Sequence, residues 1–229
     1  KNKIVDVPKC RVANTKVSKK LEELYEDGKW EQLVEFEPKK GHIEIYDLEK
    51  EVQVSLNGHY AQGGFSQVNK EMNQKLKEHL HEQVRKYVAP ETYLLDLFGG
   101  GGNLTKDLVE YKTLVVDGFP PTSQDFKEHQ KFEKINLYSR DALQKLSKKI
   151  NGISKMSIIL DPPRSGMKNL NELLSVVKPE YLFMINCEVS SAIRDLKSLD
   201  VKFEIVDVSI FDLFPGTRHF ETFTTIRLY

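Results

Sequence analysis

The sequence predicts an α/β protein: a seven-strand, mostly parallel sheet that ends in an antiparallel hairpin, preceded by a small N-terminal α+β unit. From residue 88 onward, short apolar runs alternate with helical patterns, as expected for parallel strands joined by crossover helices. The last two extended runs, 203–211 and 220–228, are separated by a segment too short for such a crossover, so they should pair antiparallel. Upstream, residues 42–46 and 52–56 alternate polar and apolar side chains, as half-buried strands do.

The composition indicates a soluble globular protein. Of 229 residues, 39% are hydrophobic, which is enough for a core, and 34 Lys and Arg residues balance 34 Asp and Glu residues. The formal net charge is therefore zero and gives no indication of a nucleic-acid partner. Two cysteines far apart favour a reducing compartment, and no signal peptide or membrane-spanning apolar run is present. We expect a cytoplasmic protein with no membrane association and no obligate protein partner.

Residues 1–62 are predicted to form the small unit, and residues 63–229 the sheet domain. The first 20 residues carry seven Lys and Arg against one acid, Asp6, and form either a basic arm that contacts phosphates or a solvated tail. The sequence starts at Lys1 rather than Met, which leaves open whether further domains precede it. The remaining patterns of the small unit predict a short helix and three strands, at 21–25, 30–37, 42–46 and 52–56.

A long amphipathic helix is predicted to open the sheet domain. Apolar residues recur at every fourth position from Val68 to Val88, which makes one packing stripe, and Pro90 ends it. Gln67 lies in the glycine-bearing loop before this helix. Like Asn69, it either caps the helix or faces a ligand.

Four consecutive glycines, Gly99–Gly102, follow the strand predicted at 94–98. Glycine allows positive φ and brings the backbone close to a ligand, so Gly100 is a candidate cofactor contact. A helix expected to start at Asn103 would point free N–H groups at the same ligand. No Gly-Lys-Ser/Thr follows, which disfavours a nucleoside triphosphate. Asp117 ends the next predicted strand, where a carboxylate can bond a ribose diol; S-adenosylmethionine and a nicotinamide dinucleotide both remain candidates.

Three further strands are predicted at 135–139, 157–161 and 181–187. Asp161-Pro-Pro-Arg164 follows the second of them, and its two prolines stiffen the loop that presents Asp161 and Arg164 to a ligand. Cys187 ends the third strand, directly before a predicted helix whose N-terminus would favour the thiolate, although Glu188 opposes that effect. From position alone, Cys187 is equally well explained as a small buried side chain.

His219 and Glu221 lie two residues apart at the start of the last predicted strand, so their side chains should share one face. Glu221 could then serve as a general base that His219 hydrogen-bonds. An isolated His-x-Glu pair is, however, also a common surface feature.

Four separated stretches resemble the RNA 5-methyluridine (uracil-C5) methyltransferases. They are Gly64-Phe-Ser-Gln-Val-Asn69, Asp96-Leu-Phe-Gly-Gly-Gly-Gly-Asn103, Asp161-Pro-Pro-Arg-Ser-Gly166 and Asp212-Leu-Phe-Pro-Gly-Thr-Arg-His-Phe-Glu221. Asn186-Cys187, followed by Ala192-Ile-Arg-Asp-Leu196, is similar to the nucleophile motif of that family. The terminal hairpin also matches the sheet of the class I methyltransferases, which favours S-adenosyl-L-methionine as the cofactor.

The resemblance implies methyl transfer to carbon-5 of a uridine in ribosomal or transfer RNA. It makes Cys187 the nucleophile that adds to carbon-6 of uracil, and Glu221 the base that removes the carbon-5 proton. The target base would be flipped out of its stack or taken from a loop. The implied cofactor-binding residues are Gln67, Phe98, Gly100, Asn103, Asp117 and Asp161, and Arg164 and His219 are expected to contact the substrate.

The sequence departs from this family in three respects. Cys187-Glu188-Val189 replaces the usual Cys-Asn-Pro, Gly99 replaces a cysteine of the glycine loop, and the upstream RNA-binding barrel and iron–sulfur cysteines are absent. Cys10 alone cannot hold a cluster, so we expect no metal ion. Two alternatives therefore stay open: a methyltransferase on another acceptor, and a non-catalytic relative that binds the cofactor or RNA.

Overall fold

The computed structural model describes residues 8–10, 13–28, 43–48, 51–56, 69–120 and 125–229. The chain divides into two compact units, one formed by residues 1–68 and 214–217, the other by residues 69–213 and 218–229. The predicted domain boundary between residues 62 and 63, the predicted strand 30–37 and Gln67 all lie outside the described residues.

The smaller unit contains helix α1 (Thr15–Glu26) and strands β1 (Ile43–Leu48) and β2 (Glu51–Leu56). The two strands, both predicted, pair antiparallel, which confirms the α+β character of this unit. The Asn14 side chain caps α1 by accepting the Val17 N–H at 2.8 Å. Because of this cap the helix starts before the predicted 21–25, and the end of the basic segment 1–20 is helical rather than an arm or tail.

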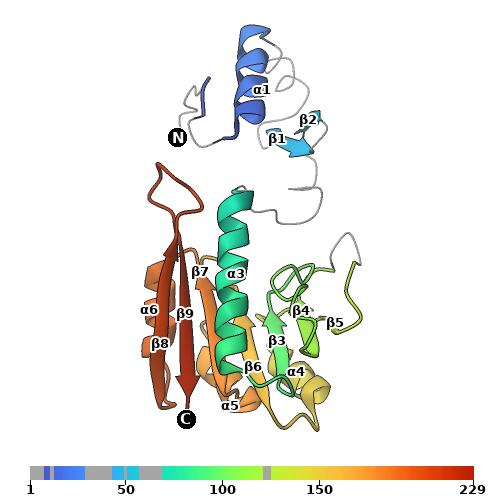
Figure 1. The fold of residues 1–229 in the computed structure, drawn as a ribbon, viewed down its shortest axis with the longest axis vertical. Coiled ribbons are helices and arrows are strands. Elements are labelled where there is room, and N and C mark those ends of the chain that lie inside the picture. The colour runs from blue at the N-terminus through green and yellow to red at the C-terminus, as the bar shows by residue number, and fades with distance from the viewer. Residues whose placement is uncertain (1–7, 11–12, 29–42, 49–50, 57–68, 121–124) are drawn as a thin grey trace. The chain divides into compact units, whose positions relative to one another are not determined.

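The larger unit is built on a seven-stranded sheet of order β5-β4-β3-β6-β7-β9-β8 (Figure 1). Its elements are α3 (Lys70–Tyr87), β3 (Tyr93–Leu97), β4 (Thr113–Asp117), β5 (Gln130–Lys134), α4 (Ala142–Ile150), β6 (Met156–Leu160), α5 (Leu170–Val177), β7 (Tyr181–Asn186), α6 (Val189–Lys197), β8 (Phe203–Phe211) and β9 (Glu221–Leu228). Strands β3 to β7 are parallel, whereas β9 runs antiparallel to both β7 and β8. The predicted fold class is confirmed.

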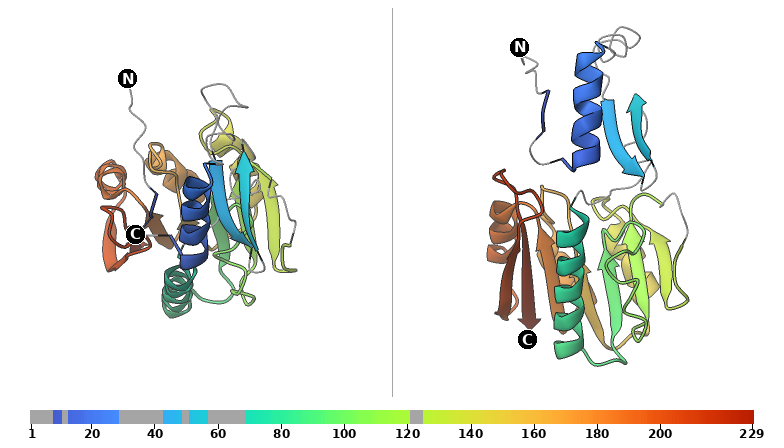
Figure 2. Two further views of the ribbon diagram at one scale, coloured as in Figure 1. Left: turned by 90° about the horizontal axis from the view of Figure 1, so that it is seen from above. Right: turned by 45° about the horizontal axis from the view of Figure 1, so that its top comes forward.

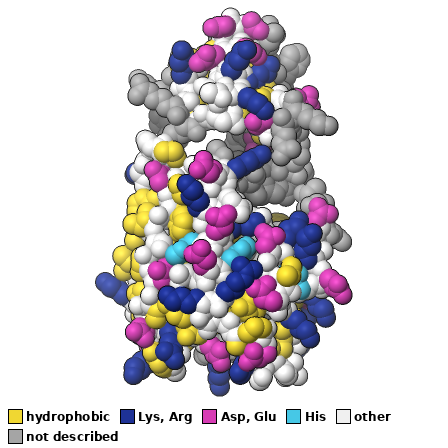
Figure 3. Space-filling view, in the orientation of Figure 1, with side chains coloured by type: hydrophobic (Ala, Val, Ile, Leu, Met, Phe, Trp, Pro, Cys, Tyr) yellow, Lys and Arg dark blue, Asp and Glu magenta, His cyan; other side chains and the backbone are white. Residues whose placement is uncertain are grey.

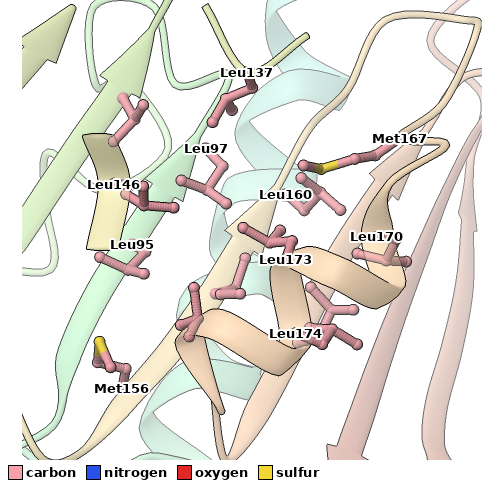
Figure 4. Packing of buried hydrophobic residues seen from close by; sticks show 14 of the residues in the cluster. Leu95, Leu97, Leu137, Leu146, Met156, Leu160, Met167, Leu170, Leu173 and Leu174 are labelled. Atoms are coloured by element: carbon pink, nitrogen blue, oxygen red, sulfur yellow. The ribbon is translucent and has the colours of Figure 1, made fainter. Parts of the chain in front are cut away.

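Helices cover both faces of this sheet. Figure 2 shows α3 on one face and α4, α5 and α6 on the other. The predicted stripe of α3 is confirmed, since Leu76, Leu80 and Val84 are buried, and the side chain of Asn69 caps the helix by accepting the Met72 N–H at 3.0 Å. On the opposite face, leucines of β3 and β6 pack against those of α4 and α5 (Figure 4). The strands are therefore buried on both sides and their carboxyl ends are rigidly placed.

One predicted strand is wrong. The third strand of the chain's parallel series is β5 at Gln130–Lys134, not the apolar run at 135–139. β5 is an edge strand of the sheet, so polar residues suit it, as they do solvated edges in general. Ile135 and Leu137 are apolar because they join the core cluster beside α4, not because they belong to a strand.

The helix expected at Asn103 is also absent. Residues 98–107 form turns, in which the N–H groups of Gly102, Thr105 and Leu108 each bond a carbonyl three residues earlier. Positive φ angles at Phe98, Gly100 and Gly102 interrupt helical geometry at the start of this segment. Basic side chains of α3 then hold the turns in place: Lys77 binds Asn103 and Asp107, and His81 binds the Leu104 carbonyl.

The surface carries charges of both signs. On the face of the larger unit that Figure 3 shows, Lys and Arg side chains are interspersed with Asp and Glu rather than gathered into one basic field. Among the described residues, no helix is both long and apolar enough to cross a membrane.

Candidate active site

The sheet topology brings the predicted site residues to one edge. β3, β6 and β7 are adjacent and parallel, so Asp96, Asp161 and Cys187 all lie at or just beyond their carboxyl ends. In the antiparallel pairing of β7 with β9, Asn186 lies opposite Thr222. Cys187 and Glu221, one residue further in each direction, are therefore opposite each other across the two strand ends.

A pocket of about 300 Å³ opens at Cys187. Its lining comes from the start of α6 and from the segment that leads into β9: Cys187, Glu188, Val189, Arg218, His219 and Phe220. This volume lies at the lower end of the range for small-molecule pockets, which suits a single planar base better than a large ligand. The pocket thus places a thiol where a small substrate can reach it.

Burial and neighbouring charges perturb the two predicted catalytic groups. Burial raises the pKa of Glu221 to about 7, although the Arg164 guanidinium acts in the opposite direction. The Glu221 side chain is almost fully buried, and its Oε2 has no hydrogen-bond partner among the described residues. Burial, and then the Glu221 carboxylate, raise the pKa of the Cys187 thiol, whereas a hydrogen bond from Arg164 and its charge lower it. Thiol, carboxyl and guanidinium thus act on one another directly.

Two further carboxyl groups extend this cluster. Burial, together with the charges of Glu221 and Asp96, raises the pKa of Asp161 to about 8. Burial also raises the pKa of Asp96 to about 6, although the hydroxyl of Thr105 donates to it at 2.8 Å. The pKa values of Asp96, Glu221 and Asp161 are thus all raised, and burial is the main cause for each. Such perturbed groups are concentrated at functional sites.

The glycine loop has the open backbone that a nucleoside ligand needs. Gly100 adopts a φ of 51°, and a Cβ added there would meet no atom within 4 Å. Its N–H donates to Asp117 Oδ2 at 3.1 Å, and the Phe119 N–H donates to Oδ1 at 2.9 Å. Each carboxylate oxygen keeps a further lone pair. A carboxylate beside an open backbone at the carboxyl edge of the sheet fits a ribose diol.

A buried polar network that the sequence did not reveal fixes this loop. Gln130, the first residue of β5, donates to the Gly102 carbonyl at 2.8 Å and to the Thr105 hydroxyl at 2.9 Å. Thr105 in turn donates to Asp96. A Cβ at Gly102 would lie 2.7 Å from the Gln130 amide nitrogen, so only glycine fits there. No sequence signal links Gln130 with a loop nearly thirty positions earlier, because the contact exists only in the folded sheet.

The remaining predicted residues lie around the same edge. Phe98 packs its ring 5.4 Å from that of Tyr138, and Asn103 is exposed next to Lys77. His219 lines the pocket but precedes β9, so the alternation argument that placed it on one face with Glu221 does not apply. Among the described residues, no group of three or more His, Cys, Asp and Glu side chains could hold a metal ion.

The sequence suggested that the Glu188 carboxylate would disfavour the Cys187 thiolate, and the structure shows where that carboxylate is bound. The Ser190 hydroxyl donates to the Glu188 carboxylate at 2.8 Å and lowers its pKa, with further lowering from Arg218 and Arg164. The charges that act on the Cys187 thiol are those of Glu221, Arg164 and Asp161. Glu188 therefore lines the pocket without being a main influence on the thiol.

Comparisons with known proteins agree with the predicted resemblance. Residues 130–227 match the family described as tRNA (Uracil-5-)-methyltransferase. The 23S rRNA (uracil(1939)-C(5))-methyltransferase RlmD of Shewanella halifaxensis is 28% identical over 186 residues, which is 77% of this chain and 40% of that protein. RlmD of Marinomonas sp. is 26% identical over 83% of this chain and 44% of that protein. The chain thus spans less than half the length of these curated relatives.

A solved structure confirms the fold. The tRNA (uracil-54, C5)-methyltransferase of Pyrococcus abyssi, in complex with S-adenosyl-L-homocysteine, aligns with a TM-score of 0.53 and 19% sequence identity over 80% of this chain and 43% of that one. At this identity the likeness concerns the fold, which is that of the class I methyltransferases. The resemblance to the RNA uracil-C5 methyltransferases, predicted from the motifs, is confirmed by the matches together.

Proposed function

We propose that this chain, a relative of the RNA uracil-C5 methyltransferases, transfers a methyl group from S-adenosyl-L-methionine to carbon-5 of a uridine in ribosomal or transfer RNA. The observation that carries the proposal is the position of Cys187 opposite Glu221, with Arg164 against the thiol, at a pocket of about 300 Å³. Thiol, base and guanidinium are the groups that this reaction needs.

The chemistry of uracil explains why these groups are required. Carbon-5 is a poor nucleophile until the Cys187 thiolate adds to carbon-6, which moves the electron pair of the 5,6 double bond towards carbon-5. The cofactor supplies an electrophilic methyl group. Glu221 then takes the proton from carbon-5, the double bond re-forms, and the carbon–sulfur bond breaks to release the thiolate. Arg164, which lowers the pKa values of both Cys187 and Glu221, favours the ionised form of each.

The cofactor would be held at the glycine loop and the neighbouring strand ends. Its fit is supported by the open backbone at Gly100 and by the Asp117 carboxylate beside it. Phe98, Asn103 and Asp161 border the same edge of the sheet, and Gln67 is assigned by resemblance alone. The proposed substrate contacts are His219, which lines the pocket, and Arg164, which acts on the Cys187 thiol.

The test is to quantify 5-methyluridine in ribosomal and transfer RNA from cells with and without the gene. The gene is then restored as wild type, as Cys187→Ala, or as Ser198→Ala, which changes an exposed hydroxyl at the end of α6. The proposal expects loss of the nucleoside from one RNA class, and rescue by wild type and Ser198→Ala but not by Cys187→Ala. Rescue by Cys187→Ala would refute the covalent mechanism. An unchanged nucleoside content in every RNA fraction would favour another acceptor or a non-catalytic cofactor-binding relative.

A further inference from the structure

Helix α6, which directly follows Cys187 and its neighbour Glu188, also forms hydrogen bonds to a neighbouring loop. Three of its side chains reach the loop 164–167, which follows the double proline after β6. The Ser191 hydroxyl donates to the Arg164 carbonyl at 2.6 Å, and Arg194 Nη2 donates to the Ser165 carbonyl at 2.7 Å. The Met167 N–H donates to Asp195 Oδ2 at 2.6 Å. Successive backbone groups of one loop are thereby held by one helix.

The geometry of this contact is tightly constrained. Ser191 and Asp195 are almost fully buried, and Asp195 forms an ion pair with Arg194, whose Nε lies 2.9 Å from Asp195 Oδ1. Gly166 adopts a φ of 69°, and a Cβ there would collide with the Asp195 carboxylate and the Arg194 guanidinium. The loop approaches the helix as closely as a bare backbone allows.

The spacing along α6 explains how one helix serves both the thiol and the loop. Cys187 directly precedes the Glu188 cap of the helix, and within the helix Ser191 and Asp195 lie four residues apart, so these two side chains share the face that meets the loop. The same helix therefore sets the position of the thiol and the position of the backbone that carries Arg164. A shift of the loop would move the guanidinium away from the sulfur.

We propose that Ser191, Arg194 and Asp195 are positioning residues that hold the loop 164–167 so that the Arg164 guanidinium stays against the Cys187 thiol. They do not touch the reacting atoms and act through Arg164. The inference rests on the proposed function in one respect only, that the thiolate of Cys187 is the reactive species. It assigns a role to the Arg194-Asp195 pair, which the sequence motif contains and the reaction itself does not use.

The consequence can be measured without RNA or cofactor. Arg164 lowers the pKa of the Cys187 thiol, so a displaced Arg164 should leave that pKa higher. A rise of about one unit slows alkylation about tenfold at a pH well below the thiol pKa, because the thiolate is the reactive form. The 229-residue chain carrying Cys10→Ser has Cys187 as its one remaining cysteine, so intact-mass measurements on it report that thiol alone.

The experiment measures the alkylation rate by iodoacetamide against pH for Ser191→Ala, Gly166→Ala and Arg164→Met in this background. Ser198→Ala is the matched control, since its hydroxyl bonds the Asp195 carbonyl within α6 and not the loop. We expect Arg164→Met to slow alkylation about tenfold near neutral pH, Ser191→Ala and Gly166→Ala to slow it several-fold, and Ser198→Ala to leave it unchanged. Ser191→Ala added to Arg164→Met should have no further effect, because the loop acts only through the guanidinium.

Two results would overturn the inference. One is a Ser191→Ala chain that melts at a lower temperature but keeps the wild-type alkylation profile. The other is an equal effect of Ser191→Ala with and without Arg164. A shifted profile in a chain that methylates no RNA would leave the inference standing and would count against the proposed function instead.

Discussion

The charge state of Asp161 provides a direct test of the site's electrostatics. The pKa of this carboxyl is raised from 3.8 to about 8 by burial and by the charges of Glu221 and Asp96. A carboxyl whose pKa is raised in the folded state binds its proton more tightly when folded than when unfolded. Its contribution to stability is therefore complete below the unfolded pKa and is lost as the pH rises to the folded pKa.

The magnitude follows from the size of that shift. A shift of about four pH units at about 1.4 kcal/mol each would give about 6 kcal/mol for an isolated, dry carboxyl. Asp161 is partly exposed and its charge interacts with those of Glu221 and Asp96, so we expect about 2–4 kcal/mol over the whole titration. Asp161→Asn imitates the protonated form at every pH. Relative to wild type, this variant should therefore gain about 1.5–3 kcal/mol in free energy of unfolding between pH 5 and about pH 8, and little more up to pH 9.

Urea unfolding curves, followed by circular dichroism at half-unit steps from pH 5 to pH 9, measure this difference. Asp125→Asn, a change at an exposed aspartate, is the control and should track wild type throughout. If the unfolding free energies of wild type and Asp161→Asn stay parallel over the whole range, Asp161 does not titrate where we place it. The argument that burial and neighbouring carboxylates raise the pKa of Asp161 would then fail.

Three further predictions concern activity and packing. Glu221→Gln should allow the thiol to add but not the carbon-5 proton to leave, so a covalent protein–RNA adduct should accumulate on denaturing gels, with none for Cys187→Ala. The single-turnover methylation rate should rise as the pH passes about 7, where Glu221 becomes a free base, and a flat profile would argue against that role. Leu80→Ala should cost about 2–5 kcal/mol of unfolding free energy, because this fully buried side chain of α3 leaves a cavity against the sheet; a loss below about 1 kcal/mol would contradict tight packing there.

Local patterns in the sequence were enough to predict the main architecture. The apolar run of β3, the four-residue spacing of α3 and the short connection before β9 each reflect a period or a length that the backbone imposes by itself. The same holds for the predicted strand ends at which Asp161 and Cys187 lie.

Where local patterns misled, long-range contacts decided the structure. Ile135 and Leu137 looked like a strand, but the sheet pairs the polar residues of β5 with β4 and uses those apolar side chains in the core. The segment after the glycine loop looked like a helix start. It forms turns instead, because positive φ angles open it and side chains of α3 bind its carbonyl and carboxylate groups.

The sequence by itself determined the fold class, the order of most elements and which residue types meet at the carboxyl edge, because periodicity, turn residues and strand ends are local properties. The tertiary structure alone decided the chemistry of that edge. The raised pKa values of Glu221 and Asp161 arise from burial by distant segments. Arg164 acts on Cys187, and Ser191 of α6 hydrogen-bonds the Arg164 carbonyl, although each pair of residues is more than twenty positions apart in the sequence. Only packing of the folded chain brings these residues together.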